Sequence, residues 1–244
     1  MKTNTLTIDG QEIPFIEGQT IIEAATAAHV YIPHLCHNPE FKPHGSCKLC
    51  TVQVNGRHCS ACTMPASAGQ DVLNNTRELN DARRSITQML FVEGNHFCPG
   101  CEKSGNCQLQ AVGYFVGMLD SHFAHFYPNR RVDASHPDIL LDLDRCILCE
   151  LCVRASRDCD GKDVFAIAGR GMDSHLVVNA DSGKLADTDI SSHDKAAHVC
   201  PVGAILIKRS AWQAPIGQRE FDHEDIAEVA LEHENGPCGG GENG

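Results

Sequence analysis

The sequence predicts an α+β protein made of three small units and a polar tail. Strand-like and helix-like patterns follow one another within short stretches of the chain. The 244 residues include 14 cysteines, and aromatic residues make up only 5%, so the cores rest on small aliphatic side chains. Small units with such cores need cross-links, and bound metal is one kind. We expect the units at residues 1–78, 79–130 and 131–212, with the tail at 213–244.

Charge and hydropathy narrow the classes of function. The net charge is −12, with 32 acidic and 20 basic residues, which argues against nucleic-acid binding because that requires a basic face. No apolar run reaches the roughly 18 residues of a membrane span. Residues 1–4 lead into a strand pattern without an apolar signal region. We therefore expect a cytoplasmic chain whose cysteines bind metal rather than form disulfides.

The first unit is predicted to be a small sheet curled over one helix. Its strand patterns are 5–8, 12–16 and 51–54. Asp9-Gly10 and Asn55-Gly56 favour tight hairpin turns after the first and third of these strands. A capping box of Thr20 and Glu23 opens the helix, which ends before Pro33.

The first group of cysteines lies in this unit and suits a [2Fe–2S] cluster. Three cysteines occupy one long loop and a fourth follows the next hairpin: Cys36, Cys47, Cys50 and Cys62. This is the plant-type spacing with a longer first gap. Gly45 lets backbone amides approach the cluster. Cys59 is the alternative for the fourth ligand. We prefer Cys62, because Pro65 makes the backbone rigid where the chain leaves the cluster after Cys62. Cys59 is then a small buried hydrophobic residue.

The third unit carries the most specific pattern. Three closely spaced cysteines and a remote Cys-Pro pair are Cys146, Cys149, Cys152 and Cys200-Pro201. This is the pattern of a bacterial [4Fe–4S] site. Ser156 holds the place of a further cysteine, so we expect one cluster here. Cys159 is off the pattern and is interpreted as a free thiol. The surrounding elements are strands at 139–143, 163–168, 176–179 and 205–208 and a helix at 191–199.

A long helix is predicted over residues 74–92. Its apolar stripe, expected to pack in the core, is Leu79, Ala82, Ile86, Met89 and Leu90.

The few aromatic residues then gather at 111–135, with His122 and His125 among them. A cofactor site is one interpretation, but we favour packing between the cluster-binding units. Acidic residues fill 218–235, and the glycine-rich 236–244 is flexible by composition, so Cys238 is not expected to be a ligand.

The first unit resembles a known family of domains. Cys36, Gly45, Cys47, Cys50 and Cys62–Pro65 resemble the N-terminal [2Fe–2S] domain of the large iron–sulfur subunit of respiratory complex I, which also opens many iron-only hydrogenases. The resemblance implies a β-grasp, ferredoxin-like first unit. It also implies a small helical second unit and a bacterial-ferredoxin-like third unit.

The second unit resembles the next motif of the same family. That motif binds a [4Fe–4S] cluster through three cysteines and one histidine. The resemblance implies thiolate ligands at Cys98, Cys101 and Cys107 and an imidazole ligand at His96. His96 precedes the first cysteine by two positions, whereas the family usually has four. The alternative is that His96 only contacts a ligand or lies on the surface.

The whole of residues 3–210 resembles the diaphorase small subunits of soluble NAD-reducing [NiFe] hydrogenases. The motifs are Gly-Asn-His-x-Cys, the run from Cys101 to Gly113, and the closing Cys200–Gly203. The resemblance implies one [2Fe–2S] and two [4Fe–4S] clusters in a hetero-oligomer. Partners would be a flavin- and NAD-binding diaphorase subunit and the hydrogenase small and large subunits, which would hold FMN, NAD and the Ni–Fe centre.

Other functions remain open from the sequence. The chain lacks a dinucleotide fingerprint and a phosphate loop, so it offers no catalytic site of its own. A zinc-stapled adaptor is less favoured because the cysteines form triplets rather than paired knuckles. A self-sufficient enzyme would have to turn over alone. The electron-transfer chain could instead serve a complex I-like NADH dehydrogenase or an NAD(P)-linked formate dehydrogenase.

Overall fold

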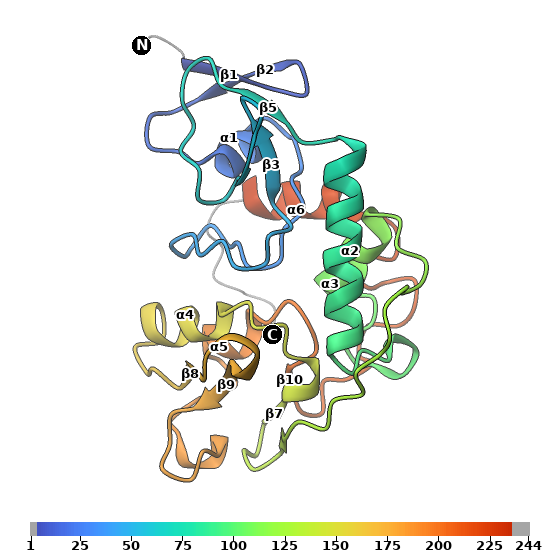
Figure 1. The fold of residues 1–244 in the computed structure, drawn as a ribbon. Coiled ribbons are helices and arrows are strands. Elements are labelled where there is room, and N and C mark those ends of the chain that lie inside the picture. The colour runs from blue at the N-terminus through green and yellow to red at the C-terminus, as the bar shows by residue number, and fades with distance from the viewer. Residues whose placement is uncertain (1–3, 236–244) are drawn as a thin grey trace.

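A computed structural model describes residues 4–235 of the chain. Both helices and strands are present, which confirms the mixed α and β content. A sheet with helix α1 (Ile21–Ala27) occupies one end, and helix α2 (Arg77–Glu93) runs from there along one side to the other end (Figure 1). Cys238 and the predicted flexible segment 236–244 lie outside the described residues. No helix within the described part is long and apolar enough to cross a membrane.

The N-terminal sheet has five strands in the order β2-β1-β5-β3-β4. They are β1 (Asn4–Ile8), β2 (Gln11–Phe15), β3 (Thr51–Val54), β4 (Arg57–Ser60) and β5 (Asp71–Leu73). Both predicted hairpins form, and β1 pairs in parallel with β5. Thr20 and Glu23 form the predicted capping box of α1. The sequence analysis missed β5, because three residues are too few for an alternation signal.

The buried face of helix α2 combines part of the predicted apolar stripe with polar side chains. The helix begins after Thr76, whose side chain accepts a hydrogen bond from Leu79 N at 3.2 Å. Ala82 and Met89 are exposed, whereas Arg83 is buried. The reason lies in the partners, because the Arg83 guanidinium donates to the carbonyls of Leu49, Thr51 and Asn74. Three residues of the predicted stripe, Leu79, Ile86 and Leu90, are nevertheless buried or packed against an apolar core.

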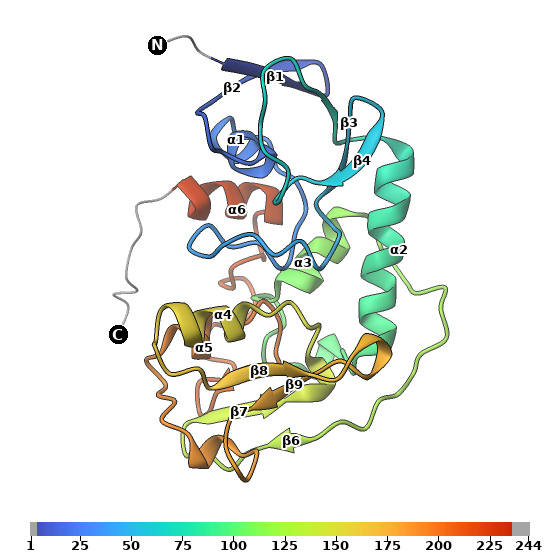
Figure 2. The ribbon, with the colours of Figure 1, turned by 60° about the vertical axis from the view of Figure 1, so that its left-hand side comes forward.

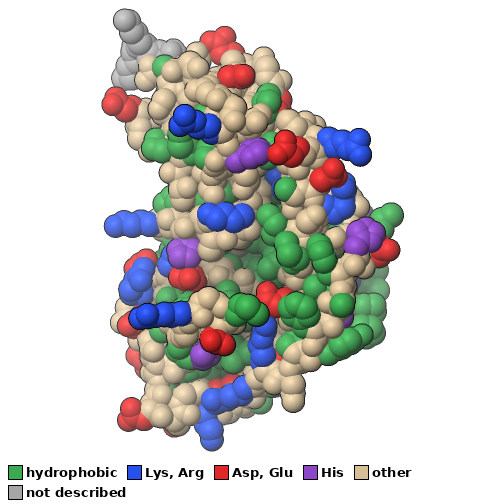
Figure 3. Space-filling model, viewed as in Figure 1, with side chains coloured by type: hydrophobic (Ala, Val, Ile, Leu, Met, Phe, Trp, Pro, Cys, Tyr) green, Lys and Arg blue, Asp and Glu red, His purple; other side chains and the backbone are tan. Residues whose placement is uncertain are grey.

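The segment after α2 is compact at its start and exposed beyond. It contains a 3₁₀ turn, η1 (Cys98–Gly100), and helix α3 (Gln108–Phe115), which the sequence analysis missed. The aromatic residues of this segment were expected to pack between units. Phe115 does so with part of its ring, edge-on to Tyr31 with centroids 5.0 Å apart, but the prediction is wrong for most of the others. The exposed ones include Tyr114, Phe115, Phe123, Phe126 and Tyr127. Figure 3 shows apolar side chains gathered on this side of the molecule, over α2 and α3.

Two small sheets and two helices form the other end of the molecule (Figure 2). The three-stranded sheet has the order β10-β7-β6, and β8 pairs with β9. The elements are β6 (Val132–Asp133), β7 (Ile139–Asp142), α4 (Leu151–Asp158), β8 (Phe165–Ala168), β9 (His175–Val178), α5 (Lys195–His198) and β10 (Ile205–Ile207). The predicted helix at 191–199 shortens to α5, because a polar loop precedes it. Phe165, Ile139 and Leu141 are at the centre of the core.

The predicted tail is partly a helix. Residues 226–235 form α6 (Ile226–Asn235), which packs against α1 and α3. Ile226 and Val229 are buried there, so the prediction of a flexible polar tail from residue 213 does not hold for this helix. Upstream of it, Arg219 donates to Asp222 at 2.6 Å and to the carbonyl of Ser104 at 3.2 Å. The acidic composition had hidden the short apolar stripe of α6.

Candidate iron–sulfur sites

The first site brings together four thiols at the foot of the N-terminal sheet. Cys36 follows α1, the pair Cys47 and Cys50 precedes β3, and Cys62 follows β4. The Sγ atoms of Cys50 and Cys62 are 3.4 Å apart, and the Cys47 amide donates to Cys36 Sγ at 3.5 Å. All but Cys47 are buried. Strands β3 and β4 therefore hold two ligand loops together.

Backbone geometry in this loop favours amide donors to sulfur. Gly45 has φ +72°, a conformation that suits glycine. The pKa of the Cys62 thiol is lowered, first by a hydrogen bond from Cys50 and further by the Gly45 amide. Cys59 lies on β4 opposite Val52 and packs against the core beneath the sheet. The geometry thus favours Cys62 over Cys59 as the fourth ligand.

The third site closes around a small cavity in the C-terminal part. Four cysteines line it together with apolar side chains, and the cysteines are Cys146, Cys149, Cys152 and Cys200. Leu148 and Glu150 have φ of +53° and +59°, which folds the backbone tightly between the cysteines. Burial raises the pKa of the Cys149 and Cys152 thiols well above the usual range. Iron must therefore displace protons from these thiols when it binds.

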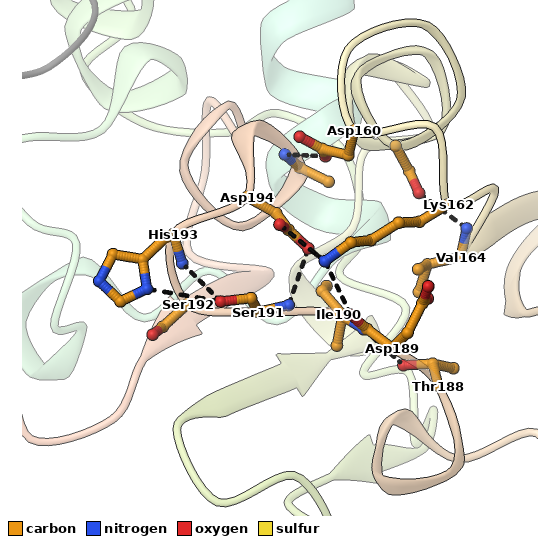
Figure 4. Close-up of polar contacts among 12 residues, drawn as sticks. Asp160, Lys162, Val164, Thr188, Asp189, Ile190, Ser191, Ser192, His193 and Asp194 are labelled. Carbon is orange, nitrogen blue, oxygen red and sulfur yellow. Dashed lines mark hydrogen bonds and ion pairs between the residues drawn. The ribbon is translucent and has the colours of Figure 1, made fainter.

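A polar network fixes the segment that leads to the remote ligand, Cys200. Lys162 donates from Nζ to both carboxylate oxygens of Asp194, at 2.7 and 2.9 Å, and to the Asp189 carbonyl at 2.8 Å (Figure 4). The Asp160 carboxylate accepts hydrogen bonds from the first two amides of α5. These contacts join the end of α4 to the start of α5, so Cys200 has a defined position opposite the cysteine triplet.

Ser156 has a structural role where the usual pattern has a further cysteine. Its side chain is completely buried. The hydroxyl accepts a hydrogen bond from Val164 N at 2.7 Å and so fixes the chain entering β8. A ligand to a second cluster is replaced here by a backbone anchor.

The middle site is built from turns and the start of one helix. Burial raises the pKa of the Cys98 and Cys107 thiols, and the charge of Cys101 raises both further. Cys107 is the residue before α3, and the pKa of its thiol reaches about 12 although the Gln110 amide lowers it. Cys98 and Cys101 are only partly buried.

His96 is the least ordinary residue of the middle site. Its Nε2 atom is buried without a hydrogen-bond partner among the described residues. Burial, followed by the charge of Arg145, lowers the pKa of His96 to about 4, so the imidazole is neutral at pH 7. A Cβ on Gly94 would stand 2.4 Å from Nε2, so only glycine fits there. A buried, neutral and unpartnered nitrogen fits a metal ligand.

Sequence reasoning missed the residues that fasten the middle site to the third. Arg145 donates from Nη1 to Glu102 at 2.7 Å and lies 3.7 Å from Cys101 Sγ. Its Nε pairs with Asp142 at 2.9 Å. A Cβ on Gly203 would approach Cys101 Sγ to 3.3 Å. A signal was available, because Arg145 directly precedes Cys146 and Gly203 lies three residues after Cys200.

The donor sets fit iron–sulfur clusters. No three His, Cys, Asp or Glu side chains among the described residues converge closely enough to hold a single metal ion. A cluster spaces its ligands more widely, because they bind different iron atoms. The triplet of Cys146, Cys149 and Cys152 with the remote Cys200 fits a cluster better than the paired knuckles of a zinc site.

Family models cover most of the chain. Residues 2–77 match the 2Fe-2S iron-sulfur cluster binding domain, and residues 139–207 match the 4Fe-4S single cluster domain. Residues 83–122 match the NADH-ubiquinone oxidoreductase-G iron-sulfur binding region. These matches confirm that the chain contains binding domains for both kinds of cluster.

Similar proteins include whole chains and parts of longer ones. The chain is 42% identical to the gamma subunit of the NAD-reducing hydrogenase HoxS of Cupriavidus necator, over 94% of this chain and 98% of that one. It superposes with TM-score 0.91 and 52% identity on a chain in the crystal structure of an NAD⁺-reducing [NiFe]-hydrogenase in the H2-reduced state, covering 95% of this chain and 98% of that one. It is also 31% identical to the mitochondrial 78 kDa subunit of NADH-ubiquinone oxidoreductase of Candida albicans, over 86% of this chain but only 29% of that protein.

Proposed function

The chain belongs to the family of the gamma subunit of NAD-reducing hydrogenase, and we propose from this that it is the iron–sulfur electron-transfer subunit of such a complex. It has no catalytic site of its own in this proposal. One observation carries the proposal: three separate sets of four candidate ligands lie in one chain, each held by its own loops. In this proposal such a chain converts no substrate itself and transfers electrons between partner subunits.

Each set of ligands is assigned one cluster. The first is a [2Fe–2S] cluster held by Cys36, Cys47, Cys50 and Cys62. The second is a [4Fe–4S] cluster with Cys98, Cys101 and Cys107 as thiolate ligands and His96, whose buried Nε2 has no partner among the described residues, as the imidazole ligand. The third is a [4Fe–4S] cluster held by Cys146, Cys149, Cys152 and Cys200. Such clusters, when bound, accept and release single electrons.

The protein's own residues prepare these positions. Strands and apolar side chains exclude water from the first and third sites, and backbone amides point at the thiols there. The proposed units are a β-grasp, ferredoxin-like unit at 1–78, a small helical unit at 79–130 and a bacterial-ferredoxin-like unit at 131–212. Contacts such as Gln108 N to Pro201 O at 2.9 Å hold the second and third units in fixed register.

The partners follow from the family rather than from this chain alone. We propose that electrons pass between a [NiFe] hydrogenase module, made of small and large subunits, and a diaphorase subunit that binds FMN and NAD. The overall reaction would be H2 + NAD⁺ = H⁺ + NADH, in the cytoplasm. FMN, NAD and the Ni–Fe centre would all lie on partner subunits.

Anaerobic isolation of the full chain with its clusters tests the proposal. We expect a brown protein with about ten iron atoms per chain, from two, four and four in the three clusters. Electron paramagnetic resonance after dithionite reduction should show the reduced clusters. A pale sample without iron or resonance signals would refute it.

In a second candidate function, the same three clusters would transfer electrons between other partner subunits. The 31% identity to a subunit of NADH-ubiquinone oxidoreductase favours this alternative, although the chain spans less than a third of that protein. Isolation of the native complex, with identification of each associated protein, separates the two. Hydrogenase subunits support the first proposal, and quinone-reductase or formate dehydrogenase subunits support the second.

A further inference from the structure

Arg154 lies buried between the first and third sites. It is on α4 and is only 5% exposed. Its Nη2 donates to the Cys36 carbonyl at 2.6 Å and to the Cys149 carbonyl at 3.3 Å. Its Nη1 donates to the Lys42 carbonyl at 3.1 Å. One guanidinium therefore joins the loop of the first ligand set to the loop of the third.

An exposed carboxylate one turn along α4, that of Asp158, interacts with the charge of Arg154 only at a distance. None of the carboxylates whose positions the structure describes forms an ion pair with it. Its acceptors are backbone carbonyls, and the guanidinium also stacks over the Phe41 ring at 5.6 Å. Arginine stays protonated throughout the pH range in which proteins fold. A buried charge without a counter-charge is strongly unfavourable, so an opposite charge is expected nearby.

We propose that Arg154 is a positioning residue whose counter-charge is supplied by the clusters of the first and third sites. This rests on the proposed function, because only thiolate-ligated clusters would place negative charge there. Each cluster carries net negative charge from its thiolates, and that charge increases on reduction. A fixed positive charge between two such groups stabilises their reduced forms and raises both potentials. The same guanidinium also fixes the distance between the two loops.

The middle site provides an internal contrast. Arg145 contacts Cys101 there, but its charge is already balanced by Glu102 at 2.7 Å and Asp142 at 2.9 Å. Arg154 bonds to the loops of the first and third ligand sets only. The loss of its charge should therefore change two potentials and spare the third.

The test is a redox titration of the full chain, isolated anaerobically with its clusters and followed by electron paramagnetic resonance. Arg154→Gln removes the charge and Arg154→Lys keeps it. Arg157→Gln is the matched control, because Arg157 lies one turn along the same helix and is exposed beside Asp158. We expect Arg154→Gln to lower the potentials of the first and third clusters and leave the middle one unchanged. Arg154→Lys should give a smaller shift in the same two clusters, and Arg157→Gln none.

The contrary outcomes are separate from failure of the proposed function. Unchanged potentials in Arg154→Gln, equal shifts in all three clusters, or the same shifts in Arg157→Gln would overturn the role of Arg154. If Arg154→Gln does not fold, Arg154→Lys decides: a small shift confined to the first and third clusters supports the role, and any other pattern overturns it. If the unaltered chain itself shows no clusters, the proposed function fails instead.

Discussion

The first and middle sites are held in different ways. The first stands on a five-stranded sheet and one helix, over a core of completely buried side chains such as Ile13 and Ile21. The middle site has no strand among its ligands. Its partly exposed thiols are held by side chains from distant segments, chiefly Arg145, with Arg219 bonding to the Ser104 carbonyl.

The difference suggests two kinds of preorganisation. The apolar core under the sheet positions Cys50 and Cys62 through local contacts, whereas the loop of Cys36 also packs against the C-terminal part of the chain. The middle site depends on ion pairs with segments near residues 142–145 and 219–222, which belong to later parts of the sequence. It therefore needs those parts in place. Variants near residues 142–145 and 219–222 should harm the middle site more than the first.

The largest effect is expected from Cys200→Ala. The third site loses its remote ligand, so iron should fall from about ten to about six atoms per chain. The segment after α5 should also loosen, because metal binding is coupled to folding. The loosening should reach the middle site, since Pro201 accepts the Gln108 amide at 2.9 Å, and should affect the first less, because β3 and β4 hold Cys50 and Cys62. Iron analysis and the resonance spectrum of each cluster measure this.

The control for that variant is Cys159→Ala. Cys159 is exposed and lies just beyond α4, so its loss should leave the iron content unchanged. A Cys200→Ala protein that kept the spectrum of the third cluster would contradict the assignment. Damage to the first cluster as large as that to the middle one would contradict the comparison.

A core variant should reverse this pattern. Ile13→Ala removes a completely buried side chain from β2 and should lower the free energy of unfolding of the N-terminal part by about 2–5 kcal/mol. Iron release from the first site should become faster, and release from the middle site should not. Ile16→Ala is the matched control, since Ile16 follows the same strand and is 73% exposed. Equal destabilisation by both variants would show that the core does not support the first site.

The same contrast explains what could be predicted from sequence. The hairpins, the capping box of Thr20 and Glu23, and the cysteine spacings are local patterns, and local geometry determines them. Arg83, Arg145 and Arg154 make their decisive contacts with residues far along the chain. The spacing of apolar residues along the sequence does not indicate such long-range contacts. The stripe predicted for α2 was wrong at Ala82 and Met89 and lacked the buried Arg83 for this reason, although its other residues are buried or packed against the core.

A moderate effect is expected from Arg145→Gln. The change removes two ion pairs and leaves Asp142, which is largely buried, without its partner, at a cost of about 1–3 kcal/mol. The middle cluster should lose iron to a chelator faster, while the first should not. The decay of each resonance signal after chelator addition measures this. Arg84→Gln, which breaks a more exposed pair with Asp81, should have little effect. An unchanged rate at the middle site would show that the ion pairs are not needed there.

The smallest structural effect should come from His96→Cys, which tests the chemistry of the middle site rather than its support. A thiolate in place of neutral imidazole makes the cluster more negative, so its potential should fall by on the order of 100 mV while the [4Fe–4S] spectrum remains. Redox titration measures the shift, with His122→Ala, at an exposed position, as the control. The buried Nε2 without a partner among the described residues fits a metal ligand, and the glycine at position 94 leaves space for the imidazole ring. An unchanged potential would mean that His96 is not a ligand. In that case the shortened spacing before Cys98 would mark a departure from the family's ligand set.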